Sequence, residues 1–249
     1  MMDWPIPADI PRAALVTGGA KRIGRAMVEA LAAQGFAVAI HYRSSRKEAE
    51  ALLADIGGRG CVVEADLAQE AEVLSLAATV ERELGPMGVL VNNASVFERD
   101  EWNDTTRESW DRHLEPNLRA PFVLTQAFAN SLPKEAHGMV LNILDQRVWN
   151  LTPHFISYTV SKSALWTLTQ SLALALAPRI RVNAIGPGPV LPAPGQSDAH
   201  FNTMRDKTPL GIGATPEEIA RAALSLLCLP SVTGQMVALD GGQHLQWRA

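Results

Sequence analysis

Short apolar runs rich in β-branched residues alternate with longer amphipathic stretches along the chain, and this alternation limits the possible folds more than any other feature. A strand that is apolar on both faces must be covered on both sides, and helices that connect parallel strands supply that cover. The sequence therefore predicts an α/β fold with a parallel sheet of seven strands and helices on both faces.

The expected elements follow one another without a linker or a break in composition. A chain of 249 residues suits one domain, residues 1–249. The segment at about 187–210 starts rich in proline and glycine and continues polar, so we expect an irregular substrate loop or lid there. Strands are expected at residues 13–17, 37–42, 61–65, 89–92, 139–144, 181–184 and 236–239, and helices at 23–34, 46–56, 70–84, 108–131, 158–177 and 216–229.

Charge and cysteine content narrow the class of function. A net charge of −4 lacks the basic excess that nucleic acid or an anionic membrane would attract, which favours a small-molecule substrate. Cys61 and Cys228 lie far apart and are expected to be reduced, and residues 1–11 do not read as a signal peptide, so a cytoplasmic location is expected. The histidines are scattered without ligand spacing and predict no metal site.

The first candidate binding motif follows the first expected strand. Residues 17–24 read TGGAKRIG and run into a helix. Gly18 and Gly24 allow a tight turn, and the free N–H groups of a helix N-terminus attract phosphate. An ordinary strand-to-helix turn is the alternative, but the position in the first β-α unit favours a pyrophosphate site.

The end of the second expected strand bears on the choice of cofactor. Residues 41–44 read HYRS, without the acidic residue that binds a ribose 2′-hydroxyl in NAD enzymes. Arg43 can pair with a 2′-phosphate and Ser44 can donate to it, which favours NADPH, unless Arg43 is a solvated surface residue. Asp66 and Leu67 are placed to meet the adenine edge, although Asp66 would also serve as a helix N-cap.

Two further patterns lie where ligands bind in open parallel sheets. Asn92, Asn93, Ala94 and Ser95 follow the fourth strand, and they either form a turn or hold the strand and the cofactor wall by amide hydrogen bonds. Tyr158 and Lys162 stand at i and i+4 on one helix face. An adjacent ammonium and an oxidised nicotinamide would lower the pKa of a phenol and make Tyr158 a proton donor, whereas the pair alone would be structural.

Together these motifs resemble the short-chain dehydrogenase/reductase family over nearly the whole chain. The resemblance implies a Rossmann-type, doubly wound fold, hydride transfer from a nicotinamide cofactor, and commonly a homotetramer. It also implies that Tyr158 is the acid, that Lys162 binds the ribose, and that Asn117 keeps a water in a proton relay. The residues expected to bind NADPH are Gly18, Arg22, Ile23, Gly24, His41, Tyr42, Arg43, Ser44, Asp66, Leu67, Asn93, Ala94, Ser95, Tyr158, Lys162, Pro187 and Gly188.

Departures from the usual family pattern point to a narrower group. Arg22 replaces the middle glycine, and Asp145 replaces the serine expected thirteen residues before Tyr158. A carboxylate cannot donate to a developing alkoxide, so Asp145 suits a substrate with N–H donors or one that is protonated on nitrogen. The chain looks like the pteridine reductase and dihydromonapterin reductase branch. That resemblance implies a substrate site of Arg22, Ser95, Phe97, Asp145 and Tyr158, with Phe97 stacking on the pterin.

The sequence therefore predicts reduction of a dihydropterin to its tetrahydro form. Hydride would come from NADPH, and the proton would reach nitrogen through Asp145, Tyr158, Lys162 and ordered water. A carbonyl reductase of 3-oxoacyl or sugar-ketone type is the first alternative, and a non-catalytic NADP-binding sensor or subunit is the second. Trp149 and residues 191–201 are expected to shape the substrate pocket.

Overall fold

A single parallel sheet organises the computed structural model, which describes residues 5–193 and 195–246. The strand order is β3-β2-β1-β4-β5-β6-β7, and every neighbouring pair is parallel, which confirms the predicted fold. Both ends of the predicted domain, 1–4 and 247–249, and residue 194 of the predicted loop lie outside the described residues. The strands are β1 (Ala13–Val16), β2 (Ala37–Tyr42), β3 (Gly60–Glu64), β4 (Val89–Asn92), β5 (Gly138–Ile143), β6 (Ile180–Pro187) and β7 (Met236–Leu239).

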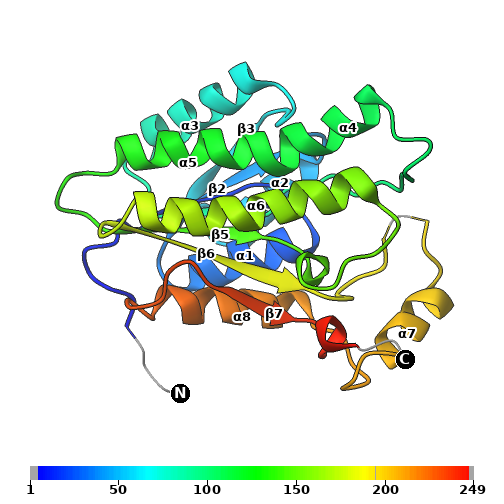
Figure 1. Ribbon diagram of the computed structural model, residues 1–249. Helices are drawn as coiled ribbons and strands as arrows, with labels where there is room; N and C mark the ends of the chain where they lie inside the picture. The colour runs from blue at the N-terminus through cyan, green and yellow to red at the C-terminus, as the bar shows by residue number, and fades with distance from the viewer. Residues whose placement is uncertain (1–4, 194, 247–249) are drawn as a thin grey trace.

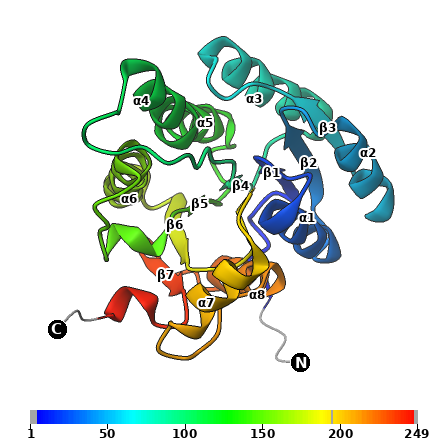
Figure 2. The ribbon, with the colours of Figure 1, turned by 90° about the vertical axis from the view of Figure 1, so that its right-hand side faces the viewer.

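Helices cover both faces of the sheet, as Figures 1 and 2 show. One face carries α1 (Arg22–Ala33), α2 (Arg46–Asp55) and α8 (Pro216–Leu227), and the other carries α3 (Glu70–Leu84), α5 (Ala120–Ser131) and α6 (Ile156–Ala175). Each layer buries its own apolar cluster, with Met27, Leu52 and Ile219 in the first and Leu76, Val80 and Phe128 in the second. None of the helices in the described part of the chain has the length and apolarity to cross a bilayer.

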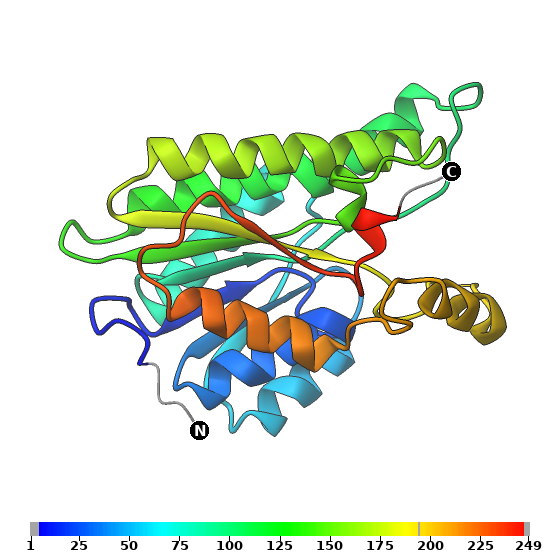
Figure 3. The same cartoon turned by 60° about the horizontal axis from the view of Figure 1, so that its bottom comes forward.

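The strand order reverses direction at β1. Val16 of β1 is in register with Ile40 of β2 on one side and with Val91 of β4 on the other. The connections that leave β1 and β4 therefore pass to opposite sides of the sheet, and a crevice opens between them at the carboxyl edge. The chain beyond β6 also returns over this edge, where α7 lies (Figure 3).

The helix predicted at 108–131 is interrupted, which the sequence analysis did not foresee. It consists of α4 (Arg107–Leu114), a π-helical turn η1 (Glu115–Arg119) and α5. Pro116 has no N–H to donate, so the regular hydrogen-bond ladder cannot continue through it and the turn widens. Asn117 lies inside this turn and is fully buried.

The expectation of a wholly irregular segment at 187–210 is wrong in part. Residues Asp198–Asp206 form α7, whose cap Ser197 accepts a hydrogen bond from the N–H of His200 at 3.3 Å. The helix is short and polar, and its buried apolar residue is Phe201, so it shows little apolar periodicity in the sequence. Short 3-10 turns lie at Gln146–Val148 (η2) and Gln243–Leu245 (η3).

Buried amides tie the central strands to α6. Asn92 Nδ2 donates to Asn142 Oδ1 at 2.8 Å, and Asn142 Nδ2 donates to Thr169 Oγ1 at 2.9 Å. These bonds link β4, β5 and α6, which carry the motifs singled out in the sequence. Asn92 thus has the structural role that was expected for an amide at this strand end.

We predict that Asn142→Ala lowers the free energy of unfolding by about 1–3 kcal/mol, because Asn92 and Thr169 lose a buried partner. The measurement is chemical denaturation followed by circular dichroism. Ser225→Ala on the exposed face of α8 is the control and should change the value by less than about 0.5 kcal/mol. Equal effects of the two substitutions would contradict the role of the buried chain.

Candidate active site

The glycine turn after β1 leaves no room for a side chain at Gly24. A Cβ on Gly24 would lie 2.1 Å from Gly18 O and 2.8 Å from Asn93 Nδ2, and Gly18 itself has φ of +61°. Asn93 Nδ2 donates to Thr17 O at 2.9 Å and to Gly18 O at 3.2 Å, which fixes the turn from the β4 side. The first turn of α1 has no side-chain cap from Lys21. Its N–H groups and positive dipole end therefore suit a phosphate.

His41 supports the turn from beneath rather than reaching outward. Its Nδ1 accepts from the N–H of Gly18 at 2.9 Å, and its Nε2 lies 3.0 Å from Ala65 O, to which it donates. Burial lowers the pKa of His41, so the ring stays neutral in the tautomer that both contacts need. Both ring nitrogens are thus used within the protein, and the contribution of His41 to a cofactor site is to shape it.

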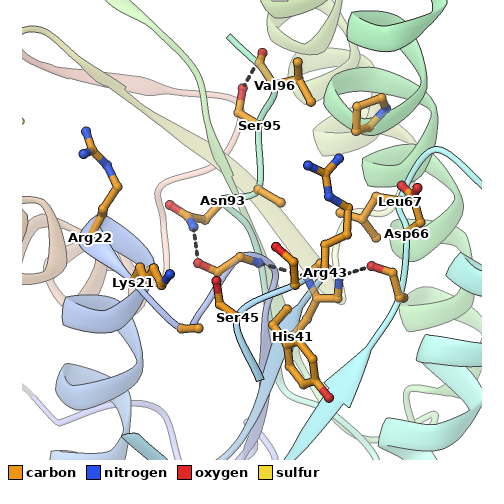
Figure 4. Close-up of a pocket in the computed structure, with 18 of the residues that line it drawn as sticks. Lys21, Arg22, His41, Arg43, Ser45, Asp66, Leu67, Asn93, Ser95 and Val96 are labelled. Carbon is orange, nitrogen blue, oxygen red and sulfur yellow. Dashed lines mark hydrogen bonds between the residues drawn. The ribbon is translucent and has the colours of Figure 1, made fainter. Parts of the chain in front are cut away.

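A cavity of about 400 Å³ opens over this turn (Figure 4). Lys21 and Arg22 lie at one end, and the exposed Arg43 lies at the other beside Asp66 and Leu67. Of the predicted cofactor residues, these line it: Gly18, Arg22, Ile23, Gly24, His41, Tyr42, Arg43, Ser44, Asp66, Leu67, Asn93, Ala94 and Ser95. Tyr158, Lys162, Pro187 and Gly188 do not line it.

Two predicted cavity residues also have structural partners. The Oδ1 of Asp66 accepts from the N–H of Ala68 at 3.0 Å, an Asx turn before α3 rather than the N-cap of that helix, which is Gln69. Tyr42 Oη donates to Glu64 Oε2 at 3.2 Å. Ser45, which was not predicted from the sequence, also lines the cavity beside Ser44. A second hydroxyl after the strand was the signal that could have found it.

A second cavity of about 410 Å³ lies beyond Arg22 and Ser95, which line both cavities. All five predicted substrate residues, Arg22, Ser95, Phe97, Asp145 and Tyr158, line it. The segment after β6 forms another wall through Gly188, Pro189, Val190, Leu191, Ala193, Gln196, Phe201 and Met204. Trp149 is not part of the lining, contrary to expectation, and packs edge-on against Trp166 with ring centroids 6.2 Å apart.

Tyr158 and Asp145 meet inside the second cavity. Tyr158 Oη donates to Asp145 Oδ2 at 3.0 Å, while Asp145 Oδ1 accepts from the N–H of Arg147 at 2.9 Å. Burial, followed by the charge and the hydrogen bond of Asp145, raises the pKa of Tyr158 well above its ordinary value. The sequence led us to expect a lowered pKa for Tyr158, but the side chains of the protein do not lower it. Tyr158 is therefore a firmly protonated hydrogen-bond donor.

Lys162 lies behind Tyr158 on the next turn of α6. Its Nζ donates to Ile143 O at 2.8 Å and stands 5.9 Å from the centre of the Tyr158 ring. Burial lowers the pKa of Lys162 to about 8, an effect that the charge of Asp145 opposes. The ammonium is consequently charged at neutral pH but loses its proton in mildly alkaline solution.

The buried Asn117 accepts from Val96 N at 2.8 Å and donates to Val96 O at 2.9 Å, so its amide holds the main chain beside Phe97. Arg147, which was not predicted from the sequence, lines the second cavity with its guanidinium carbon 5.3 Å from the Phe97 ring centre. Its charge opposes the rise in the pKa of Tyr158. A cation two residues after Asp145 was the available signal.

Comparison with known proteins identifies the family. A family model described as Enoyl-(Acyl carrier protein) reductase matches residues 18–244. A short-chain dehydrogenase/reductase from Armillaria gallica is 33% identical over 251 residues, which cover 93% of this chain and 95% of that protein. The chain belongs to the short-chain dehydrogenase/reductase family.

Two solved structures resemble this short-chain reductase closely. FolM Alternative dihydrofolate reductase 1 from Brucella canis, complexed with NADP, has a TM-score of 0.94 and 46% identity, with 98% of each chain covered. Its counterpart from Brucella suis, also in complex with NADP, has a TM-score of 0.92 and 48% identity, with 95% of this chain and 96% of that chain covered. The predicted likeness to the pteridine reductase branch of the family is confirmed.

The unusual arginine of this short-chain reductase occupies a backbone conformation typical of glycine. Arg22 has φ of +55°, in the left-handed region where side chains are strained. Its Nη2 donates to Leu191 O at 3.3 Å and so connects the glycine turn with the segment after β6.

Across the described residues no three His, Cys, Asp or Glu side chains converge as a metal site.

We predict that kcat/KM of the enzyme falls as the pH rises through about 8, because Lys162, with a lowered pKa of about 8, loses its charge there. Below that pH the ammonium is retained and the rate should level off. The measurement is kcat/KM against pH at saturating cofactor. A rate that stays constant to about pH 9.5 would show that the charge of Lys162 does not matter.

Proposed function

We propose that this enzyme reduces a dihydropterin to the corresponding tetrahydropterin with NADPH. The observation that carries the proposal is the 3.0 Å hydrogen bond from Tyr158 Oη to Asp145 Oδ2 in the second cavity. A carboxylate there can accept N–H groups of a substrate but cannot donate to a developing alkoxide. The pair therefore suits a nitrogen heterocycle better than a ketone.

The cofactor of this reductase is NADP(H), in agreement with both Brucella structures, which were crystallised with NADP. The uncapped start of α1 and the tight turn at Gly18 and Gly24 fit a pyrophosphate. We propose that Arg43 and Ser44 hold the 2′-phosphate and that Lys162 holds the ribose. When bound, NADPH supplies the hydride.

We propose that the side chains around the second cavity orient the substrate and deliver the proton. Asp145 would accept a substrate N–H, and Tyr158 would pass its proton toward the nitrogen that is being reduced. Its raised pKa keeps it protonated between turnovers but opposes the transfer, so the positive charge of the nearby Lys162 would assist the step and water would restore the proton. Phe97 presents a flat ring at the cavity, with 39% of its surface exposed, which suits stacking on a pterin. The names of the Brucella proteins, alternative dihydrofolate reductases, support a substrate with a pterin ring.

We further propose that the segment at 187–210 is a substrate lid, since several of its residues line the second cavity and Leu191 O accepts a hydrogen bond from Arg22.

A homotetramer is proposed as well. On α6, Val160 and Leu174 are 40% and 84% exposed and lie about four turns apart, on one face that another copy of the chain would cover. A cytoplasmic location accords with the two separated cysteines.

We predict that Arg43→Ala raises the KM for NADPH about ten- to a hundredfold, because the 2′-phosphate loses a charge-assisted hydrogen bond. The KM for NADH, which lacks that phosphate, should stay within about twofold and serves as the internal control. Both constants are measured by the loss of nicotinamide absorbance. An equal change with both cofactors would mean that Arg43 does not contact the phosphate.

We predict that Asp145→Ser lowers kcat/KM for dihydrobiopterin and dihydromonapterin at least about tenfold, because the N–H acceptor is lost. Turnover of an acetoacetyl thioester or a simple diketone should stay equal or rise, since a hydroxyl can donate to an alkoxide. The same substitution at the exposed Asp55, at the end of α2, is the control. Carbonyl turnover by the wild type with inert pterins would instead establish a carbonyl reductase.

A further inference from the structure

Three buried polar side chains form a network next to Tyr158 but outside both cavities. Asp100 precedes α4, His113 lies on α4, and Ser157 lies in the first turn of α6. Their exposed fractions are 5%, 1% and 0%. Ser157 Oγ lies 2.5 Å from Asp100 Oδ2 and 2.7 Å from His113 Nδ1, so the serine joins the other two. The reaction outlined above uses none of these groups.

The contacts of His113 define its tautomer. Its Nε2 accepts a hydrogen bond from the main-chain N–H of Glu98 at 3.1 Å, so that nitrogen carries a lone pair. The ring proton is therefore on Nδ1, where it faces Ser157 Oγ at 2.7 Å and Ser109 O at 3.1 Å. Ser157 then donates its own proton to Asp100. The network thus holds His113 as an acceptor toward Glu98.

Glu98 and Val96 flank Phe97, and both are held by their main-chain atoms. The side-chain amide of Asn117 accepts from the N–H of Val96 at 2.8 Å and donates to the carbonyl of Val96 at 2.9 Å. His113 accepts from the N–H of Glu98. The backbone of Phe97 is consequently fixed on each side by a buried side chain. Its ring then stacks on Phe155 with centroids 4.7 Å apart, and meets the Tyr158 ring edge-on at 4.7 Å.

Asp100 fixes the start of α6 in the same way. Its carbonyl accepts from the N–H of Phe155 at 2.9 Å, and its carboxylate lies 3.3 Å from the N–H of Ser157. Phe155 has φ of +59°, a left-handed conformation that these bonds help to hold. The segment that carries Phe97 and the turn that carries Tyr158 are therefore fastened to each other through one buried network.

We propose that His113 is a positioning residue for the substrate: by accepting from Glu98 N–H, it holds Phe97 at the angle needed to stack on the substrate ring. Asp100 and Ser157 keep the imidazole in the tautomer that can do this. The inference rests on the proposed function in one respect, namely that Phe97 contacts a flat heteroaromatic substrate. The cofactor cavity does not include these residues, so cofactor binding is expected to be independent of them.

Two amide substitutions separate the roles of the two ring nitrogens. His113→Gln places an amide oxygen near the position of Nε2 and retains the acceptor for Glu98. His113→Asn places its amide near Nδ1 and removes that acceptor. We expect His113→Asn to raise the KM for the dihydropterin about five- to tenfold, the effect of one lost hydrogen bond, with kcat and the KM for NADPH within about twofold of wild type. His113→Gln should remain within about twofold in all three constants.

A double-mutant cycle with Phe97→Leu tests whether His113 acts through the aromatic ring. Once the ring is gone, His113→Asn should have no further effect on the KM for the dihydropterin. Additive effects would overturn the proposal, and so would an equal loss with His113→Gln. His113→Leu replaces His113→Asn if that variant does not fold, because it also removes the acceptor while filling the buried site.

The cycle also keeps this inference distinct from the proposed function. If the wild type reduces dihydropterins and the cycle is additive, only the role of His113 is wrong. If the wild type leaves dihydropterins unchanged, the proposed function is wrong, and the role proposed for His113 in stacking fails with it.

Discussion

The pairing of β1 with both β2 and β4 is the constraint on which the rest of the site depends. It sends the following connections to opposite faces and leaves main-chain groups exposed at the crevice. Thr17 provides a partner for two of these main-chain groups, because its Oγ1 accepts hydrogen bonds from the N–H groups of Asn93 and Ala94 at 2.9 and 3.0 Å. The glycine turn and the cofactor wall are therefore built around one hydroxyl at the junction of two strands.

The chemistry of the second cavity depends on burial as much as on residue type. Tyr158 and Lys162 are both almost inaccessible, and burial displaces their pKa values in opposite directions, since each charged form is disfavoured. Asp145 reinforces the shift of the tyrosine and opposes that of the lysine, while Arg147 acts against Asp145. The result is a phenol that keeps its proton beside an ammonium that keeps its charge near neutrality.

Features set by short-range pattern could be predicted from the sequence, whereas those set by distant contacts could not. The parallel sheet of seven strands, the turn at Gly18 and the residues that line the second cavity follow from periodicity, motif spacing and family resemblance. The π turn at Asn117 depends on a proline within an otherwise helical pattern, and α7 has little apolar periodicity. The bond between Ser157 and Asp100 joins residues 57 positions apart, and no local rule connects them. The sequence predicted that His41 lies at the cofactor site. Its structural role beneath the glycine turn depends on a hydrogen bond to Ala65 O, which follows β3, and the sequence pattern did not predict that contact.

The hold on residue 97 consists of contacts to the main chain of its neighbours, at Val96 and Glu98. None of these contacts involves the side chain at position 97 itself. The backbone at position 97 is therefore held independently of the side chain it carries, whereas the ring of Phe97 packs on Phe155 and Tyr158 with centroids 4.7 Å apart in each case. A smaller side chain at position 97 would therefore change the wall of the second cavity and the packing on Phe155, while the main-chain bonds from Asn117 and His113 stay in place.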